Sequence, residues 1–201
     1  AHYNGFDSEV LRPPLNDPEL FAGGESDGYV LATGRVNAGK RQHLLIHALR
    51  HAPSARLVIA GPPDLPEDAH LLRRIAEEEG VADRVTLRLE FVPRDELAGL
   101  VNRALAVAYL PFDEDSLGYC TMEAFQAGKP VLTSTDAGGV LDIVRHEDNG
   151  LVVEPLPEAL GAALSALTGD SSRSVQMGAA GREAMREQKL SWGPTIERLV
   201  S

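Results

Sequence analysis

The stretch ALAVAYLPFDEDSLGYCTMEAFQAGKPVLTS, residues 104–134, contains strand, loop and helix signals in that order and ends in a second strand. Residues 104–112 are apolar and rich in strand formers, and they run into an acidic loop. Residues 118–130 have the pattern of a helix that is stopped by a glycine and a proline. The stretch therefore predicts a strand–loop–helix unit that leads into another strand.

The same alternation continues in both directions along the chain. Strand signals lie at residues 29–33, 56–60, 84–89, 104–110, 130–134 and 150–154. Helix-like stretches lie at residues 39–50, 67–79, 95–102, 118–127, 139–145, 157–167, 171–188 and 194–200. Strict alternation with short loops predicts an α/β fold, a Rossmann-like parallel sheet of about six strands with helices on both faces. Ligands bind such sheets beyond the carboxyl ends of the strands.

Length and charge narrow the class of protein. The chain has 201 residues, of which 43% are hydrophobic, and this is enough for one good core. Nineteen basic and thirty acidic residues give a net charge of −11, which argues against general binding of nucleic acid or anionic lipid. No apolar run approaches the roughly 20 residues that span a bilayer. We therefore expect neither a nucleic-acid partner nor direct membrane insertion.

The single cysteine indicates the cellular compartment of the protein, and the first residue bears on whether the chain is part of a longer protein. Cys120 is the one cysteine, so an internal disulfide is excluded and a reducing compartment is favoured. The chain begins AHYNG, without methionine, which is typical of a piece of a longer protein. We expect a cytoplasmic protein, whose missing part could place it at the inner face of the membrane.

The loop before residue 118 and the helix after it suit a phosphorylated ligand. A helix that starts at Gly118 presents unpaired backbone N–H groups and a positive dipole end, both of which favour phosphate. Glu123 follows in the second turn and leans back toward that end. Its carboxylate would repel phosphate but would accept hydrogen bonds from ribose hydroxyls. The pattern predicts a nucleoside diphosphate with a polyol attached; the alternative reading of Glu123 is a helix-surface glutamate.

The loop after the first strand signal carries cations. Its sequence, GRVNAGKR (residues 34–41), nearly matches a P-loop, but Arg41 stands where a Mg²⁺-binding hydroxyl is needed. We therefore expect Arg35 and Lys40 to converge on a diphosphate, the first as a planar fork and the second as a point charge. The alternative is a solvated turn with cations on its surface.

Two patterns resemble metal sites. Asp113, Glu114 and Asp115 imitate a D-x-D motif, but they are also typical of an acidic helix start capped by Ser116. Three histidines recur every four residues on one predicted helix, without a carboxylate or cysteine beside them in sequence: His43, His47 and His51. We predict no metal site at either place. Cys120 has no neighbouring histidine in sequence and is predicted to pack as a small apolar residue.

Taken in order, these segments resemble the nucleotide-sugar-binding C-terminal domain of retaining family 4 glycosyltransferases, which have the GT-B fold. The resemblance runs from end to end. Its segments are NGFDSEVLRPP (4–14), GRVNAGKRQHLLIHAL (34–49), RLVIAGPPD (56–64), LEFVPRDELAGL (89–100), DSLGYCTMEAFQAGKPVLTSTDAGGVLDIV (115–144), NGLVVEP (149–155) and SWGPTIERL (191–199).

The resemblance implies roles for individual residues. Gly34, Arg35 and Lys40 would form the loop that neutralises the donor diphosphate, and the loop at Val92 would contact the nucleobase. Backbone N–H groups at Gly118, Tyr119 and Cys120 would hold the distal phosphate, and Glu123 would bind the ribose. Gly138 and Gly139 would let a loop pass close to the sugar, or they form only a helix-entry turn. Asp115 stands where the family has a longer glutamate and would touch the transferred sugar; the alternative is a capping aspartate.

The resemblance also implies what the chain lacks. Residues 1–201 would form a single donor-binding domain. Residues 1–25 would lead in from a missing N-terminal acceptor domain, and residues 190–201 would be a C-terminal crossing helix. We expect Trp192 to anchor that helix in a core. The isolated domain would be inactive by itself.

The implied activity is metal-independent hexosyl transfer from a UDP-, GDP- or ADP-sugar to a hydroxyl acceptor, with retention and without a cofactor. Two alternatives stay open, a GT-B-fold nucleotide-sugar epimerase and a non-catalytic nucleotide-sugar-binding module.

Overall fold

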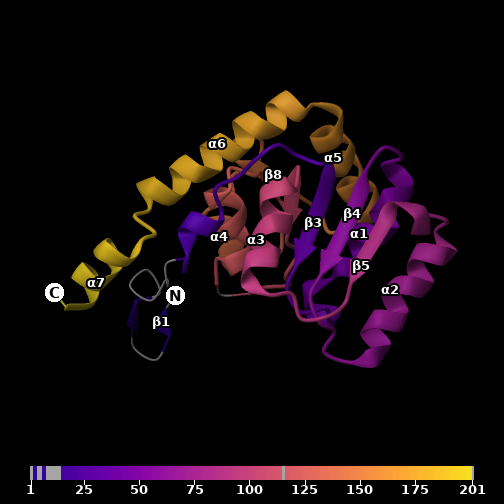
Figure 1. Cartoon of the computed structure of the whole chain (residues 1–201), viewed down its shortest axis with the longest axis horizontal. Helices are drawn as coiled ribbons and strands as arrows, with labels where there is room; N and C mark the ends of the chain where they lie inside the picture. Colours follow the sequence, from indigo (N-terminus) through magenta and orange to yellow (C-terminus); the bar gives the residue numbers. More distant parts are fainter. Residues whose placement is uncertain (1, 4–5, 8–14, 115, 201) are drawn as a thin grey trace.

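The sheet of the protein is fully parallel. In a computed structural model, which describes residues 2–3, 6–7, 15–114 and 116–200, six strands pair in the order β5-β4-β3-β6-β7-β8 (Figure 1). Their bounds are β3 (Tyr29–Thr33), β4 (Arg56–Ala60), β5 (Val85–Arg88), β6 (Ala106–Ala108), β7 (Val131–Ser134) and β8 (Gly150–Val153). This confirms the predicted Rossmann-like sheet. The order reverses between β3 and β6, so the loops after these two strands flank the crevice in which such sheets bind ligands.

Helices cover both faces of the sheet. One face carries α1 (Gln42–Ala48), α2 (Pro66–Glu78) and α5 (Pro157–Gly169), and the other carries α3 (Arg94–Arg103) and α4 (Tyr119–Gln126). Strand β3 is buried on both sides, because its side chains alternate between two cores. Val30 and Ala32 pack in one core, and Tyr29 and Leu31 pack in the other.

Helix α6 (Ser171–Glu187) joins the two layers, since it contacts α5, β8 and α4. Short 3₁₀ turns complete the connections, at η1 (Pro18–Leu20), η2 (Ala38–Lys40), η3 (Leu49–His51), η4 (Ala82–Arg84) and η5 (Gly139–Asp142). The helix predicted at residues 139–145 is only the turn η5. A two-residue antiparallel pair, β1 (His2–Tyr3) with β2 (Phe6–Asp7), was not predicted, because two-residue strands leave no periodic signal.

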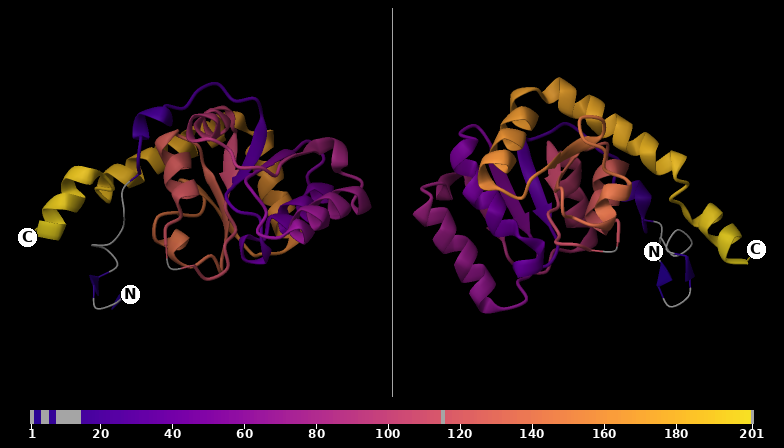
Figure 2. Two further views of the ribbon diagram at one scale, coloured as in Figure 1. Left: turned by 60° about the horizontal axis from the view of Figure 1, so that its bottom comes forward. Right: turned by 180° about the vertical axis from the view of Figure 1, so that it is seen from behind.

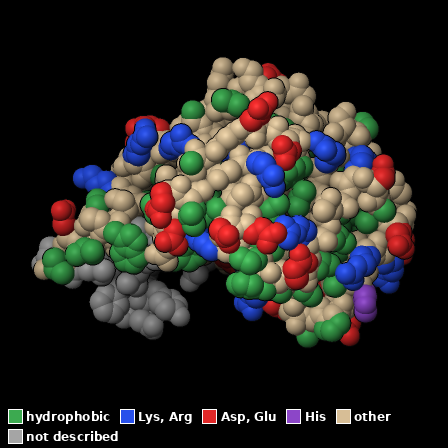
Figure 3. Space-filling view, in the orientation of Figure 1, with side chains coloured by type: hydrophobic (Ala, Val, Ile, Leu, Met, Phe, Trp, Pro, Cys, Tyr) green, Lys and Arg blue, Asp and Glu red, His purple; other side chains and the backbone are tan. Residues whose placement is uncertain are grey.

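The prediction for Trp192 is wrong. Helix α7 (Trp192–Val200) continues beyond α6 and away from the sheet in both views of Figure 2. The Trp192 side chain is half exposed, so it is not part of a core of the described residues. Among the described residues, no helix is both long and apolar enough to cross a bilayer. On the face shown in Figure 3, Lys and Arg side chains lie among Asp and Glu side chains and form no basic patch.

Close contact between α6 and the turn after α4 gives a first prediction. A Cβ on Gly178 would lie 1.9 Å from the carbonyl oxygen of Gly128, which is a backbone atom that cannot rotate away. We expect Gly178→Ala to destabilise the fold by about 3 kcal/mol, and hence to lower Tm by about 6–12 °C, because α6 must move away from α4. The matched control is Gly99→Ala in α3, where a Cβ meets nothing within 4 Å. This control should gain up to about 1 kcal/mol from helix propensity. Equal stability of the two variants in denaturant unfolding would contradict the prediction.

Candidate nucleotide-sugar site

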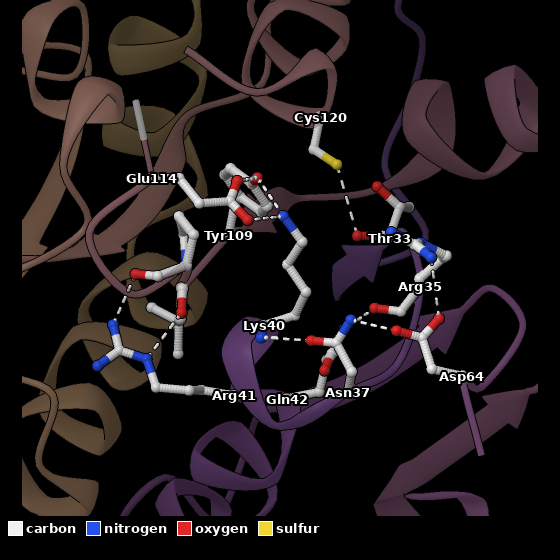
Figure 4. A network of polar contacts seen from close by, with 12 residues as sticks. Thr33, Arg35, Asn37, Lys40, Arg41, Gln42, Asp64, Tyr109, Glu114 and Cys120 are labelled. Carbon is white, nitrogen blue, oxygen red and sulfur yellow. Dashed lines mark hydrogen bonds and ion pairs between the residues drawn. The ribbon is translucent and has the colours of Figure 1, made fainter. Parts of the chain in front are cut away.

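Lys40, Tyr109 and Glu114 form a closed polar network at the crevice between β3 and β6. Lys40 ends the turn η2 after β3, and the other two residues follow β6. The Lys40 ammonium donates to the Tyr109 hydroxyl (2.8 Å) and is ion-paired with one carboxylate oxygen of Glu114. The Tyr109 hydroxyl donates to the other carboxylate oxygen at 2.6 Å (Figure 4). Sequence analysis predicted Lys40 as a site residue but neither of its partners.

The protonation states of this network follow from its geometry. Burial, followed by the hydrogen bond to Glu114, raises the pKa of Tyr109, so its hydroxyl stays a donor. Burial acts to raise the pKa of Glu114 as well, but the hydrogen bonds from Lys40 and Tyr109 and the Lys40 charge together outweigh it. The pKa of Glu114 is therefore lowered, and the residue is a carboxylate at neutral pH.

Arg41 ties three loops of the site together. It adopts a left-handed backbone conformation (φ +52°) just before α1. Its guanidinium donates to the Ser134 hydroxyl, at the end of β7, and to both carboxylate oxygens of Asp136 (2.8 Å each), just after β7. It also donates to the carbonyl oxygens of Leu110 and Pro111, which follow β6. Sequence analysis singled out Arg41 only as a misfit in a P-loop, so its actual role was missed.

Arg35 points away from Lys40. Its side chain is 71% exposed and pairs with Asp64, which follows β4, at 3.3 Å. Asp64 is also held by the Asn37 side chain at 2.8 Å, as Figure 4 shows. The structure thus directs Arg35 and Lys40 to different carboxylates. Their convergence on a diphosphate stays a prediction.

The start of α4 packs closely on the network. Gly118 has a φ of +73°, and a Cβ there would lie 2.3 Å from the Tyr109 ring, so only glycine fits. The first N–H groups of α4, at Tyr119 and Cys120, lack partners within the helix, as at any helix start. The Cys120 thiol donates to the Thr33 carbonyl at 3.4 Å, and burial raises its pKa to about 11. Cys120 is therefore a packing residue, as predicted, and is poorly suited to be a nucleophile.

Two glycines after β7 fix the acidic loop. Gly138 has a φ of +77°, and a Cβ there would lie 2.2 Å from the carbonyl oxygen of Glu114. The Gly139 N–H donates to the same oxygen at 2.6 Å. The glycines thus allow a close approach, but the segment that they approach is the Glu114 backbone. Asp115, the predicted sugar contact, lies outside the described residues.

Glu123 is buried and has a partner that sequence analysis did not find. Its side chain is 4% exposed and forms an ion pair with Arg94, at the start of α3. Burial raises the pKa of Glu123 even though Arg94 acts to lower it. Arg94 also donates to the Asn16 carbonyl (2.7 Å) and lies 4.7 Å from the centre of the Phe21 ring. The reading of Glu123 as a surface residue is wrong, while its contact with ribose stays a prediction.

Two predicted donor contacts and the histidines of α1 remain to be placed. Gly34 (φ +107°) follows β3 and lies beside Cys120, and Val92 is half-buried between β5 and α3. His47 bonds Glu79 at 2.6 Å, and its ring meets that of His43 edge-on. Among the described residues, no group of three or more His, Cys, Asp or Glu side chains could hold a metal ion.

Comparison with known proteins identifies relatives of this chain. A family model described as "Glycosyl transferases group 1" matches residues 20–184. A GDP-mannose-dependent alpha-(1-6)-phosphatidylinositol monomannoside mannosyltransferase of Mycobacterium tuberculosis is 36% identical, over 92% of this chain and 50% of its own. A D-inositol 3-phosphate glycosyltransferase of Xylanimonas cellulosilytica is 34% identical, over 81% of this chain and 39% of its own. The chain thus spans about half the length, or less, of these curated relatives.

Solved structures show the same fold. HepE of Anabaena, crystallised with UDP and glucose, superposes with a TM-score of 0.76 at 21% identity, over 99% of this chain and 55% of its own. The C-terminal domain of a group 1 glycosyl transferase from Francisella tularensis superposes with a TM-score of 0.71 at 19% identity. That alignment covers 94% of this chain and all of the Francisella domain.

Proposed function

Because the chain belongs to the group 1 glycosyl transferases, we propose that it binds the nucleoside-diphosphate sugar from which a hexose is transferred to a hydroxyl acceptor. The observation that carries this proposal is the position of Lys40. Its ammonium contacts Tyr109, and Gly118, the residue just before α4, packs on the ring of the same tyrosine. A cation and a helix N-terminus that both contact one tyrosine form a site suited to phosphate.

The chemistry follows from charge that develops on the leaving group. When the bond between sugar and diphosphate breaks, negative charge accumulates on the diphosphate. Lys40 and the α4 N-terminus are fixed before the reaction, so they stabilise this charge without reorganisation. We propose that this stabilisation needs no metal ion and that transfer retains the anomeric configuration. The acceptor would be bound by a part of the protein outside this chain, which spans about half the length of its relatives.

Two findings support a nucleotide sugar as the ligand. The Mycobacterium relative is named as GDP-mannose-dependent, and the Anabaena structure contains UDP. Glu123 lies in the second turn of α4, from which its carboxylate would accept ribose hydroxyls beside a diphosphate at the helix start. Since the named relatives are transferases, transfer is favoured over epimerisation.

Thermal unfolding of the chain with UDP, GDP or ADP tests the proposal. We expect one of the three nucleotides to raise Tm. At a ligand concentration of about 100 times Kd, the stabilisation is about 2.7 kcal/mol, which corresponds to a shift of about 5–10 °C. Added EDTA should leave this shift unchanged. The matching nucleoside monophosphate is the control and should give a smaller shift, because it lacks the distal phosphate. The proposal is wrong if none of the three diphosphates changes Tm.

A further inference from the structure

Every cation of the loop after β3 is already paired with a carboxylate. Arg35 pairs with Asp64, and Arg41 pairs with Asp136. Lys40 pairs with Glu114. A diphosphate that binds here must therefore take a cation away from a protein carboxylate or share it with one.

The three ion pairs differ in the contacts that the cation would give up in order to bind a diphosphate. Arg35 is largely exposed and its pair is long, so it contributes little and exchanges readily. Arg41 also donates to three further acceptors, two in the loop after β6 and one at the end of β7, so it is held where it is. The Lys40 ammonium has three donors, and its partners among the described residues, Tyr109 and Glu114, use two of them. Lys40 is thus the cation that can donate a hydrogen bond to a ligand while it keeps its contacts with Tyr109 and Glu114.

The Glu114 backbone is fixed where an incoming anion would meet its carboxylate. Its N–H donates to the Ala137 carbonyl (3.3 Å), and its own carbonyl accepts from Gly139 (2.6 Å). There is no room for a Cβ on Gly138 beside it. The carboxylate therefore stays next to Lys40 unless its side chain rotates, and a diphosphate at Lys40 would face it at short range.

We propose that Glu114 is an internal counter-ion of Lys40 and that a diphosphate which binds Lys40 must compete with its carboxylate. Glu114 thereby sets the affinity of the site and favours ligands with more than one negative charge at Lys40. The inference rests on the proposed function, because it takes the diphosphate of a nucleotide sugar as the competing anion. Glu114 acts through Lys40, so it is a positioning and specificity residue.

Titration calorimetry of Glu114→Gln with inorganic pyrophosphate tests the inference, since this probe does not depend on the nucleobase. Gln keeps the shape and an acceptor for Tyr109 but removes the charge. We expect pyrophosphate to bind about five- to ten-fold more tightly than to the unsubstituted chain, as expected when a like charge at close range is removed. The nucleoside of whichever diphosphate raises Tm has no phosphate, and its affinity should be the same for the variant and for the unsubstituted chain. If Glu114 only stabilised the fold, its substitution would not change the affinity for pyrophosphate while leaving the affinity for the nucleoside unchanged.

Asp113→Asn is the matched control. It makes the same change in net charge one residue away, but Asp113 is exposed. Its effect on pyrophosphate binding should stay within about two-fold, since exposed charges are screened. The inference is overturned if Glu114→Gln leaves pyrophosphate affinity unchanged or weakens it, if both variants gain equally, or if neither variant binds the probe. A nucleotide shift in Tm together with one of these results would reject the counter-ion role and leave the proposed function standing.

Discussion

Replacing Lys40 by alanine is expected to lower glycosyl transfer by about 10²- to 10³-fold, the usual cost of removing one preorganised group that stabilises transition-state charge. The measurement is turnover of the full-length protein, with the sugar of whichever nucleotide raises Tm as donor. The fold should be retained, because Glu114 is 33% exposed, so water can screen the carboxylate that loses its cation.

The control for this variant is Lys189→Ala, which removes an exposed lysine just after α6. It should retain the unsubstituted rate. If Lys40→Ala turned over at nearly that rate as well, Lys40 would not bind the leaving diphosphate. If Lys40→Ala unfolded at a much lower temperature, its loss of turnover would be a loss of fold.

The second large effect is expected from Arg94→Met, which leaves the Glu123 carboxylate buried without a cation. Removing one partner of a buried ion pair costs about 3–5 kcal/mol. Because Arg94 is 35% exposed and water screens its charge, we expect the lower end, about 3 kcal/mol, measured by denaturant unfolding at pH 7. Glu123→Gln should cost less, since the cation that it leaves unpaired can still reach water.

The dependence on pH separates this cause from lost packing. With Arg94 gone, the pKa of Glu123 in the folded state rises further above the ordinary value near 4.5. A raised folded-state pKa contributes stability that is present below the unfolded-state pKa and lost as pH rises through the folded-state pKa. The deficit of Arg94→Met should therefore be small below about pH 4.5 and should grow as pH increases. A deficit that is the same at all pH values would point to packing against Phe21.

The sheet could be predicted from the sequence because its signals are local. Strands β3 and β4 were predicted to the residue, since apolar runs between turn residues fix both type and boundary. Gly118 was predicted at the helix start, and Gly138 was predicted to let a loop pass close to the sugar. What they approach, the Tyr109 ring and the Glu114 backbone, depends on how separate loops pack, and no local pattern encodes it.

The ion pairs of the site were missed for the same reason. A buried carboxylate such as Glu123 requires a partner, but the chain offers many cations, and spacing does not select Arg94, 29 residues away. Glu114 was considered only as part of an acidic run. Its pairing with Lys40 spans 74 residues and arises because β3 and β6 lie side by side at the centre of the sheet.

The hydrogen bonds of Arg41 limit how this domain can be re-engineered. One guanidinium is bonded to the loop after β6 and to the region after β7, so these loops and its own form one structural unit. A graft that replaced residues 34–41 with a loop that lacks this arginine would leave Asp136 and two carbonyl oxygens without their hydrogen-bond donor. A loop exchange intended to change the nucleotide-sugar donor should therefore keep Arg41 or transplant all three loops together.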